Sequence, residues 1–435
     1  MIVRLAYGQG HLPIDFPESR TTVIEPRAHA GLSDERAAFL RALENPIAAR
    51  PLREWIRPGD RVCVSFSDIT RATPNERIIP WLLDHLAFVP RENIVLLNQL
   101  GTHRPNTGPE LERLLTPEVA RNYRVLNHEP ENLDAHRQFG VMRDGGPAWI
   151  NRHCADADVR IVTGFIEPHF FAGFSGGVKG VIPGVAALRT VMSSHNARNI
   201  GDPNASFGVT FGNPLWEELR DVALRVGPSF LVNVTLNQAR EITAVFAGDL
   251  IEAHRQGCEF VRESVMQPQE EAFDVVVATN SGYPLDLNLY QGVKGMSAGA
   301  RILKAGGLLI LACECREGVP AGSPMDQLHR SARSAEELLK RIMSGRETQP
   351  EQWQAQIQAL VQRRARVLVY SSLPEEVVRA CHLEPCRDIR EAVMGELRRL
   401  GGEGRIGVLP QGPLTIPYLR PIRGAPASQP PGDPR

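Results

Sequence analysis

The part of the sequence richest in reactive groups is a glycine-rich segment, Gly164–Gly184, that follows a predicted strand. Five glycines precede Pro183 in it, and His169, Ser175 and Lys179 stand among them. Glycine allows the backbone to approach a ligand closely and to aim its N–H groups at phosphate oxygens, with the Ser175 hydroxyl as a further donor. The segment therefore has two interpretations, a phosphate-binding loop or a flexible glycine loop that carries an exposed lysine.

Two common nucleotide-binding motifs are disfavoured by their spacing. A P-loop has glycine, four residues and then Gly-Lys-Ser/Thr, whereas here Val178 precedes Lys179 and Gly180 follows it. This difference disfavours ATP hydrolysis. Near the N-terminus, Gly8-Gln-Gly10 continues with His-Leu-Pro, so it lacks the third glycine and the helix of the dinucleotide fingerprint. An NAD-dependent dehydrogenase is therefore disfavoured as well.

Three histidines are candidates for proton transfer or metal binding. His103 lies in Gly101-Thr-His-Arg104, on a predicted turn after a strand, where an imidazole with an ordinary pKa of about 6.5 exchanges protons at neutral pH. His195 lies sixteen residues after Lys179, at the predicted start or end of a helix, and has no zinc-protease spacing to His169. Taken alone, each of the three is also explained by a structural role.

A further polar cluster, Ser67-Asp-Ile-Thr-Arg-Ala-Thr-Pro74, follows another predicted strand and precedes a helical stretch. Asp68 could orient an imidazole or accept a hydroxyl, and the guanidinium of Arg71 offers a forked donor for a carboxylate or phosphate. The alternative is a helix cap with a surface arginine, because Ser and Asp are favoured capping residues.

In the second half of the chain, Tyr290, Gln291 and Lys294 fall within one turn of a predicted helix or tight loop. Residues four apart share a helix face, so Tyr290 and Lys294 could point into one cleft with Gln291 beside them. A solvated helix surface is the alternative. Trp353 is most simply interpreted as a partly buried packing residue.

These candidates need a scaffold, and short β-branched runs that alternate with helical patterns supply it. The runs are 61–66, 93–97, 159–163, 230–234, 273–278 and 307–312. Such alternation is typical of mostly parallel sheets covered by helices, so the predicted fold class is α/β. Several runs end in polar or glycine-rich turns, and in open α/β sheets ligands bind outside the carboxyl ends of the strands.

The length of 435 residues predicts two domains, because a single hydrophobic core stops growing at roughly 250 to 300 residues. A polar and charged stretch at 267–271 precedes a new apolar strand and marks a boundary. We therefore expect an N-terminal α/β domain at 1–268, a C-terminal α/β domain at 269–423 and an active-site cleft between them. Residues 424–435, rich in proline and glycine, are predicted to be a disordered tail.

Composition narrows the class of protein and its partners. Lys and Arg together number 49 against 50 for Asp and Glu, so no charge bias favours nucleic acid or an anionic membrane as a partner. Neither a secretory signal nor an apolar run of about 20 residues is found, which predicts a soluble protein. Seven scattered cysteines fit reduced thiols in the cytoplasm, and Cys313 with Cys315 lacks zinc spacing and is expected to be buried and structural.

Taken together and in chain order, these segments resemble the lactate racemase family, whose members are built around a nickel-pincer nucleotide. The resemblance runs from about Ser67 to Trp353, which is most of the chain. The matching positions are Ser67-Asp68-Ile-Thr70-Arg71, Gly101-Thr-His103, Pro168-His169, Ala172-Gly173, Ser175-Gly176-Gly177-Val-Lys179, His195, and Tyr290-Gln291 with Lys294. No departure from the family pattern is found at these positions.

The resemblance implies a pyridinium mononucleotide with two sulfur-containing arms, attached covalently to Lys179. Its nickel is then held by two sulfurs and a ring carbon of the cofactor and by His195, a donor set that suits square-planar nickel. Separate maturation proteins are implied as partners that assemble the cofactor. The further residues expected to bind the cofactor or to line its pocket are Thr70, Ser175, Gly176, Gly177, Tyr290 and Trp353.

The activity that the resemblance implies is racemisation of a small 2-hydroxyacid, such as lactate, by reversible hydride transfer to the cofactor through a 2-oxo acid. His103 and His169 are implied as the two acid–base groups, one for each enantiomer. Asp68 is implied to orient a catalytic histidine. The residues implied to hold the substrate carboxylate and the 2-oxo oxygen are Arg71, Gln291 and Lys294.

Two alternatives stay open. The substrate is either a short aliphatic hydroxyacid or a bulkier malate-like, aromatic or sugar acid, because the lining of a pocket cannot be read from one sequence. A non-catalytic protein that carries the cofactor would account for the glycine-rich loop and Lys179. It would not account for His103 and His169 together with Arg71 and Lys294.

Overall fold

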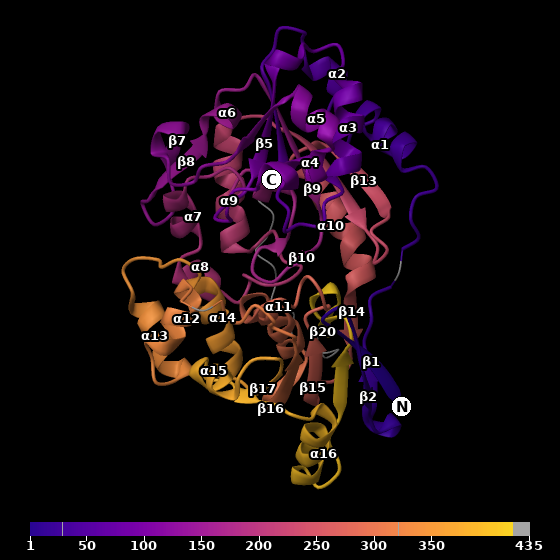
Figure 1. The fold of residues 1–435 in the computed structure, drawn as a ribbon, viewed down its shortest axis with the longest axis vertical. Coiled ribbons are helices and arrows are strands. Elements are labelled where there is room, and N and C mark those ends of the chain that lie inside the picture. The colour runs from indigo at the N-terminus through magenta and orange to yellow at the C-terminus, as the bar shows by residue number, and fades with distance from the viewer. Residues whose placement is uncertain (28, 321, 421–435) are drawn as a thin grey trace. The chain divides into compact units, whose positions relative to one another are not determined.

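The chain forms two compact units in the computed structural model, which describes residues 1–420 except 28 and 321 (Figure 1). The N-terminal unit comprises the described residues of Ala28–His195 and Gly208–Glu263. The C-terminal unit comprises those of Met1–Arg27, Asn196–Phe207 and Ser264–Arg435. The tail predicted at 424–435 lies outside the described residues.

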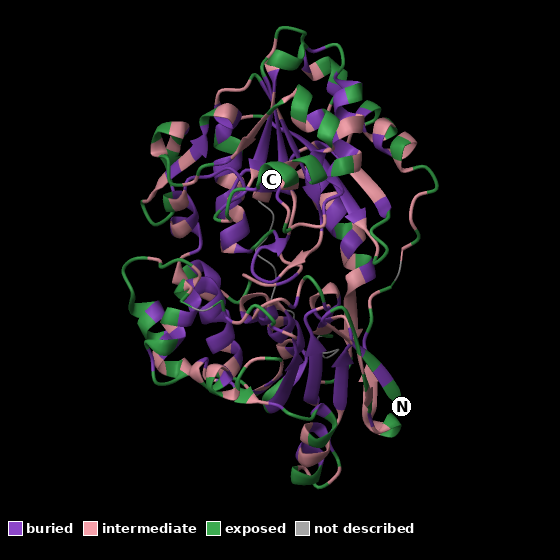
Figure 2. Ribbon diagram, viewed as in Figure 1, coloured by how far each residue is buried: buried purple, intermediate pink, exposed green. Residues whose placement is uncertain are grey.

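A six-stranded sheet forms the centre of the N-terminal unit, in the order β13-β12-β9-β4-β5-β6. Its strands are β4 (Val62–Ser67), β5 (Ile94–Gln99), β6 (Arg124–Asn127), β9 (Val159–Phe165), β12 (Phe230–Leu236) and β13 (Ile242–Asp249). Neighbouring strands are parallel except β12 with β13. Every residue of β4 is buried, as expected for a strand covered on both faces. The central strands are drawn in the purple of buried residues in Figure 2.

Helices with one apolar face cover this sheet. Phe39 of α1, Ile78 of α3 and Leu114 of α4 are buried in the same core as Phe66 of β4. A two-stranded hairpin of β7 (His136–Val141) and β8 (Pro147–Asn151) completes the unit. The helices are α1 (Glu35–Glu44), α2 (Leu52–Trp55), α3 (Asn75–His85), α4 (Gly108–Leu115), α5 (Pro117–Asn122), α6 (Arg152–Ala155), α7 (Leu188–Ser194), α9 (Pro214–Val226) and α10 (Glu252–Val265).

The C-terminal unit has its own six-stranded sheet, in the order β18-β17-β16-β15-β19-β3, and all its neighbouring strands are parallel. The strands are β3 (Thr21–Val23), β15 (Phe273–Thr279), β16 (Leu303–Ala312), β17 (Arg366–Tyr370), β18 (Glu384–Pro385) and β19 (Ile406–Leu409). The helices are α8 (Ala197–Gly201), α11 (Leu289–Ala300), α12 (Pro324–Arg330), α13 (Ala335–Ser344), α14 (Gln352–Gln362), α15 (Glu375–Ala380) and α16 (Ile389–Arg399). Two strand pairs are added, β1 (Ile2–Tyr7) with β2 (Gly10–Asp15) and β14 (Met266–Gln269) with β20 (Ile416–Leu419).

The α/β class with mostly parallel sheets is confirmed, and the six predicted strands correspond to β4, β5, β9, β12, β15 and β16. Each unit is built from more than one segment of the chain, whereas the sequence predicted the contiguous domains 1–268 and 269–423. Met1–Arg27 belongs to the C-terminal unit because β3 pairs with β19 there. Asn196–Phe207 belongs to it as well, and Gln356 of α14 donates to the Ala197 carbonyl.

Two smaller expectations are also met. Gly8 and Gln9 form a hairpin turn between β1 and β2, with Gly10 as the first residue of β2, and all seven cysteines are free and buried. Within the part of the chain that the structure describes, no helix is long and apolar enough to cross a membrane.

Candidate active site

The loops after β4, β5 and β9 carry most of the predicted site residues. The chain runs from β4 through β5 and β6 before it returns to β9, yet β5 and β9 lie on opposite sides of β4. In open α/β sheets, ligands bind at the carboxyl ends of the strands where the strand order reverses in this way. Asp68 follows β4, His103 follows β5 and His169 follows β9, so the fold brings three candidate loops to this edge of the sheet.

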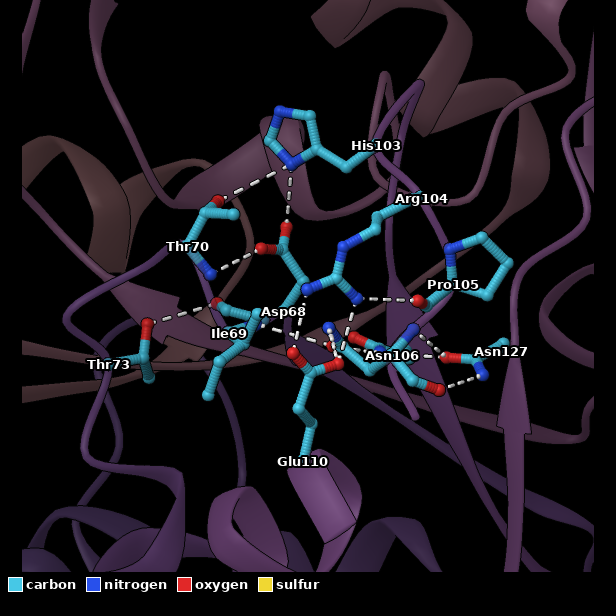
Figure 3. A network of polar contacts seen from close by, with 12 residues as sticks. Asp68, Ile69, Thr70, Thr73, His103, Arg104, Pro105, Asn106, Glu110 and Asn127 are labelled. Carbon is cyan, nitrogen blue, oxygen red and sulfur yellow. Dashed lines mark hydrogen bonds and ion pairs between the residues drawn. The ribbon is translucent and has the colours of Figure 1, made fainter. Parts of the chain in front are cut away.

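His103 is paired with a buried carboxylate. Its Nδ1 lies 3.0 Å from Oδ2 of Asp68, whose side chain is 2% exposed, and Oδ1 accepts the Thr70 backbone N–H at 2.7 Å (Figure 3). Burial raises the pKa of the Asp68 carboxyl, but the hydrogen bond and charge of His103, the charge of Arg71 and the bond from Thr70 outweigh burial and hold this pKa well below its usual range. An ionised Asp68 accepts a hydrogen bond from the Nδ1–H of His103, so the ring nitrogen Nε2 carries the lone pair.

Buried asparagines fix the loop that carries Asp68. The Asn106 Oδ1 accepts the Ile69 backbone N–H at 3.3 Å and the Asn98 amide at 2.8 Å. Asn98 also donates to Oδ1 of Asn127 at 3.0 Å, its register partner on β6, and Asn127 donates to the Asn106 carbonyl at 2.8 Å (Figure 3). This network was not predicted from the sequence, although polar residues near the ends of apolar strands are a signal that could have indicated it.

His169 has a different partner from His103. It ends β10 (Pro168–His169), which pairs with β11 (Gly173–Phe174) in a short hairpin. Its Nδ1 accepts the Ala172 backbone N–H at 3.2 Å. Because Nδ1 is the acceptor, the neutral ring carries its proton on Nε2. At Nε2, His169 therefore presents an N–H where His103 presents a lone pair.

His195 follows the last residue of α7, so the predicted helix boundary is confirmed as a helix end. It is 4% exposed, and its Nδ1 lies 2.8 Å from the Ser194 hydroxyl and 3.2 Å from the Val191 carbonyl oxygen. Burial and the nearby charge of Lys179 lower the pKa of His195 to about 3, so the ring is neutral near pH 7. With the Nδ1 proton held by these oxygens, the lone pair lies on Nε2, as in a metal-binding imidazole.

The ring of Phe171 connects three of the predicted site residues. The Lys179 Nζ lies 5.6 Å from the ring centroid, and the His195 and His169 rings lie 5.3 Å and 4.4 Å from it, both edge to face. Phe171 itself is buried. Its role was not predicted from the sequence, because a phenylalanine next to Phe170 is an ordinary core residue by type.

The glycines before Lys179 allow two buried side chains to approach the backbone. Gly176 and Gly177 have φ values of 74° and 54°, which favour glycine. A Cβ at Gly176 would lie 2.4 Å from Oδ1 of Asn233, and one at Gly177 would lie 2.5 Å from the His254 ring. Asn233 and His254 were also missed from the sequence, and a polar residue inside the apolar strand β12 is the only signal for either.

The polar groups expected to face a phosphate have protein partners in this loop. The Gly177 N–H donates to Oδ1 of Asn233 at 2.8 Å. The Ser175 hydroxyl donates to the Phe165 carbonyl at 3.0 Å and accepts the Glu167 N–H at 2.9 Å. These groups shape the loop, and any phosphate bound here needs other donors.

The remaining predicted residues lie in the C-terminal unit, on or against α11. This helix packs closely on its sheet through glycines, because a Cβ at Gly295 would lie 2.3 Å from the Thr279 carbonyl oxygen. Tyr290, Gln291 and Lys294 are half-buried and share another face of the helix. The expected common helix face is therefore observed.

Trp353 anchors the start of this face. It is 6% exposed, and its Nε1 donates to the Tyr290 hydroxyl at 3.0 Å. The next residue, Gln354, donates to the Tyr290 carbonyl. Trp353 thus packs as the sequence predicts and also fixes the position of the Tyr290 ring.

The structure places the candidates in two groups, one in each unit. In the N-terminal unit, Asp68 contacts His103, while the Phe171 ring contacts His169, Lys179 and His195. In the C-terminal unit, Tyr290 contacts Trp353, and Gln291 and Lys294 lie on the same helix face. Thr70 belongs to the first group, because its hydroxyl lies 3.4 Å from Nδ1 of His103.

The residues around Lys179 fit a metal-bearing cofactor that is attached to the protein. His195 offers one neutral imidazole nitrogen, and the amine of Lys179 is close enough for its charge to act on that ring. Residues 1–420, without 28 and 321, hold no group of three or more His, Cys, Asp and Glu side chains that could bind a metal. A metal whose other donors came from a cofactor would need few protein ligands, and the His195 imidazole could be one of them.

Comparisons with known proteins agree over nearly the whole chain. The lactate racemase N-terminal domain matches residues 7–208 and the lactate racemase C-terminal domain matches residues 268–416. A lactate racemase of Thermoanaerobacterium thermosaccharolyticum is 34% identical over 422 residues, which are 95% of this chain and 98% of that protein. A lactate racemase of Lactiplantibacillus plantarum is 33% identical over 416 residues, 92% of this chain and 98% of that protein.

Two solved structures share the fold. The lactate racemase apoprotein from Thermoanaerobacterium thermosaccharolyticum has a TM-score of 0.89 at 32% identity and covers 97% of this chain and 100% of its own. A protein from Thermotoga maritima has a TM-score of 0.64 at 19% identity and covers 88% of this chain and 98% of its own, which shows the fold alone.

Proposed function

The chain belongs to the lactate racemase family, and from that premise we propose that it interconverts the enantiomers of lactate or a similar short-chain 2-hydroxyacid. The observation that carries the proposal is the pair of imidazoles, His103 and His169, on loops at one edge of a parallel sheet. Racemisation needs a base and an acid for each enantiomer, and imidazole serves as both near neutral pH.

The proposed cofactor is a nickel-pincer nucleotide. Lys179 would hold it covalently through its amine, and His195 would be the protein ligand of its nickel. When bound, the cofactor supplies a hydride acceptor for the α-carbon of the substrate. Ser175, Gly176, Gly177 and Thr70 would bind the cofactor or line its pocket. Maturation proteins that assemble the cofactor are the proposed partners.

His103 would take the hydroxyl proton of one enantiomer on Nε2. Asp68 is its positioning residue, because the buried carboxylate holds the Nδ1 proton and stabilises the imidazolium that forms. His169 would do the same for the other enantiomer. Its ring can accept a proton on Nε2 only when Nδ1 carries one, so Nδ1 must first release the Ala172 N–H. The acid for one enantiomer is the base for the other.

Five further residues are proposed to bind the substrate or to line its pocket. Arg71 would bind the carboxylate, because a guanidinium fork matches its two oxygens. Gln291 and Lys294 would bind the carboxylate or the 2-oxo oxygen as half-buried donors on α11. Tyr290 and Trp353, fixed to each other by their hydrogen bond, would form an apolar wall. A malate-like, aromatic or sugar acid is the alternative substrate.

The test is production of the chain with and without the maturation enzymes, followed by intact mass, nickel analysis and chiral analysis of a panel of 2-hydroxyacids. We expect a covalent mass increment, nickel and racemisation only in the co-produced protein. Lys179→Ala should lose all three. An undiminished increment in that variant would overturn the attachment site, and a loaded protein that racemises no 2-hydroxyacid would overturn the activity.

A further inference from the structure

Two buried side chains that touch the glycine-rich loop belong to no part of the mechanism described above. They are Asn233, in the middle of β12, and His254, in the first turn of α10. We propose that both are positioning residues that hold the loop so that Lys179 is presented for cofactor attachment. This inference rests on the proposed function, because it concerns the same lysine.

His254 holds the loop through both the face and the edge of its ring. The face lies against Gly177, where an added Cβ would be 2.5 Å from Cγ and 2.6 Å from Nδ1. At the edge, Nε2 lies 2.8 Å from the Ser175 carbonyl oxygen, and the ring is 1% exposed. Burial lowers the pKa of His254 to about 4 despite the Ser175 bond, so a neutral ring donates its Nε2 proton to that carbonyl.

Asn233 holds the next peptide group by accepting a hydrogen bond, whereas His254 donates one. Its Oδ1 accepts the Gly177 N–H at 2.8 Å, while its own amide donates to the Val232 carbonyl at 3.1 Å. Asn233 is fully buried and pairs in register with Gly164 of β9. One buried donor and one buried acceptor therefore fix the two peptide groups that flank Gly176, three residues before Lys179.

The restraint continues through the backbone to Lys179. The Lys179 N–H donates to the Gly176 carbonyl at 3.1 Å, and its carbonyl accepts the Gly184 N–H at 3.1 Å. With the backbone fixed on both sides, the side chain takes the direction in which Nζ meets the Phe171 ring. An apolar core residue at 233 or 254 would fill the same space but would leave a buried loop peptide without its partner.

The test compares two variants of His254, one that keeps only the aromatic ring and one that keeps only a hydrogen-bond donor. His254→Phe keeps a flat ring against Gly177 but has no N–H, whereas His254→Gln keeps an amide donor for the Ser175 carbonyl. Asn233→Leu removes the acceptor for the Gly177 N–H. His329→Phe is the matched control, because His329 is a buried histidine of the C-terminal unit with no part in the loop.

The first measurement is competitive acylation of the full chain without cofactor. The sequence has four lysines, so Lys294, Lys304 and Lys340 are internal references for Lys179. Loss of a buried hydrogen bond should release the half-buried Lys179 and raise its relative acylation rate about fivefold or more in His254→Phe and Asn233→Leu. His254→Gln and His329→Phe should stay within about twofold of the parent.

The second measurement is the covalent mass increment after production with the maturation enzymes. It should fall by about fivefold or more in His254→Phe and Asn233→Leu and recover in His254→Gln. Unchanged Lys179 acylation in both variants would overturn the proposal, and so would equal acceleration at all four lysines, which indicates general unfolding. If the parent chain gains no increment, the proposed function fails, while the acylation result still decides this inference.

Discussion

His103 and His169 are the same side chain in two different hydrogen-bonding environments. His103 directs Nδ1 to the buried carboxylate of Asp68, whereas Nδ1 of His169 accepts a backbone N–H from Ala172. A carboxylate stabilises an imidazolium, but an N–H donor is compatible only with an unprotonated Nδ1. His103 is therefore ready to accept a proton, and His169 must first exchange a hydrogen bond.

This difference has a limited kinetic consequence. The two enantiomers of a hydroxyacid have equal free energies, so kcat/KM must be the same in both directions whatever the two histidines do. The difference between the two histidines can appear only in individual steps. The two enantiomers can then be oxidised at different rates, or can have different kcat and KM values with the same ratio. Breaking one hydrogen bond of ordinary net strength corresponds to about a tenfold difference or less.

The largest loss of activity is expected from replacing the third imidazole, His195, which is 4% exposed and whose Nδ1 lies against the Ser194 hydroxyl and the Val191 carbonyl oxygen. His195→Ala should lose most of its nickel and its activity, while His103→Ala and His169→Ala keep their nickel. Metal analysis of the three purified variants checks this. Full nickel occupancy in His195→Ala would remove that residue from the metal site.

A smaller loss of racemase activity is expected from replacing Asp68. Asp68→Asn removes the charge that stabilises the His103 imidazolium and should slow racemisation by about tenfold to 10²-fold. Asp84→Asn, a change at an exposed carboxylate, is the control. In single turnover the loss should be confined to one enantiomer. An equal loss for both would mean that Asp68 supports the whole site instead of His103.

The same carboxylate makes stability depend on pH. Its folded-state pKa lies below the value of about 3.9 in an unfolded chain, so its contribution is present above that pH and is lost as the pH falls toward the folded-state value. Relative to Asp68→Asn, the parent should be more stable by about 1 to 3 kcal/mol at pH 7, and this difference should shrink below about pH 4. Urea unfolding at both pH values measures it, and a constant difference would contradict the assignment.

The smallest effect is expected on stability, at the hydrogen bond between Tyr290 and Trp353 in the C-terminal unit. Tyr290→Phe removes the acceptor for the buried Trp353 N–H and should cost about 1 kcal/mol of stability. Trp353→Phe should cost less stability in the Tyr290→Phe background than in the parent chain, because the hydrogen bond between the two residues is already gone there. Thermal unfolding of the single and double variants checks this, and strictly additive losses would argue against the bond.

The positions of the strands could be predicted from the sequence, but the contacts made by the loops could be predicted only in part. The strands at 62–67, 94–99 and 273–279 could be predicted because each is a short apolar run bounded by turn residues. Asp68 and His103 could be placed together because parallel strands end at one edge of a sheet. The hydrogen-bond partner of His169 could not, because Ala172 contributes only its backbone.

The glycine-rich loop shows a second limit. Glycine type and spacing indicate close approach of something to the backbone, but not what approaches. In this fold Asn233 and His254, 56 and 77 residues from Gly177, occupy that space. Contacts over such distances along the chain depend on the packing of β12 and α10, which no local pattern specifies.

The central claim is that His103 and His169 are the bases for opposite enantiomers, and one measurement tests it most directly. Each pure enantiomer is mixed with excess loaded enzyme, and bound 2-oxo acid is measured after rapid quenching in the parent, His103→Ala and His169→Ala. We expect each variant to lose oxidation of one enantiomer by about 10²-fold or more, and the two variants to have opposite preferences. Equal impairment toward both enantiomers in one variant, with none in the other, would contradict it.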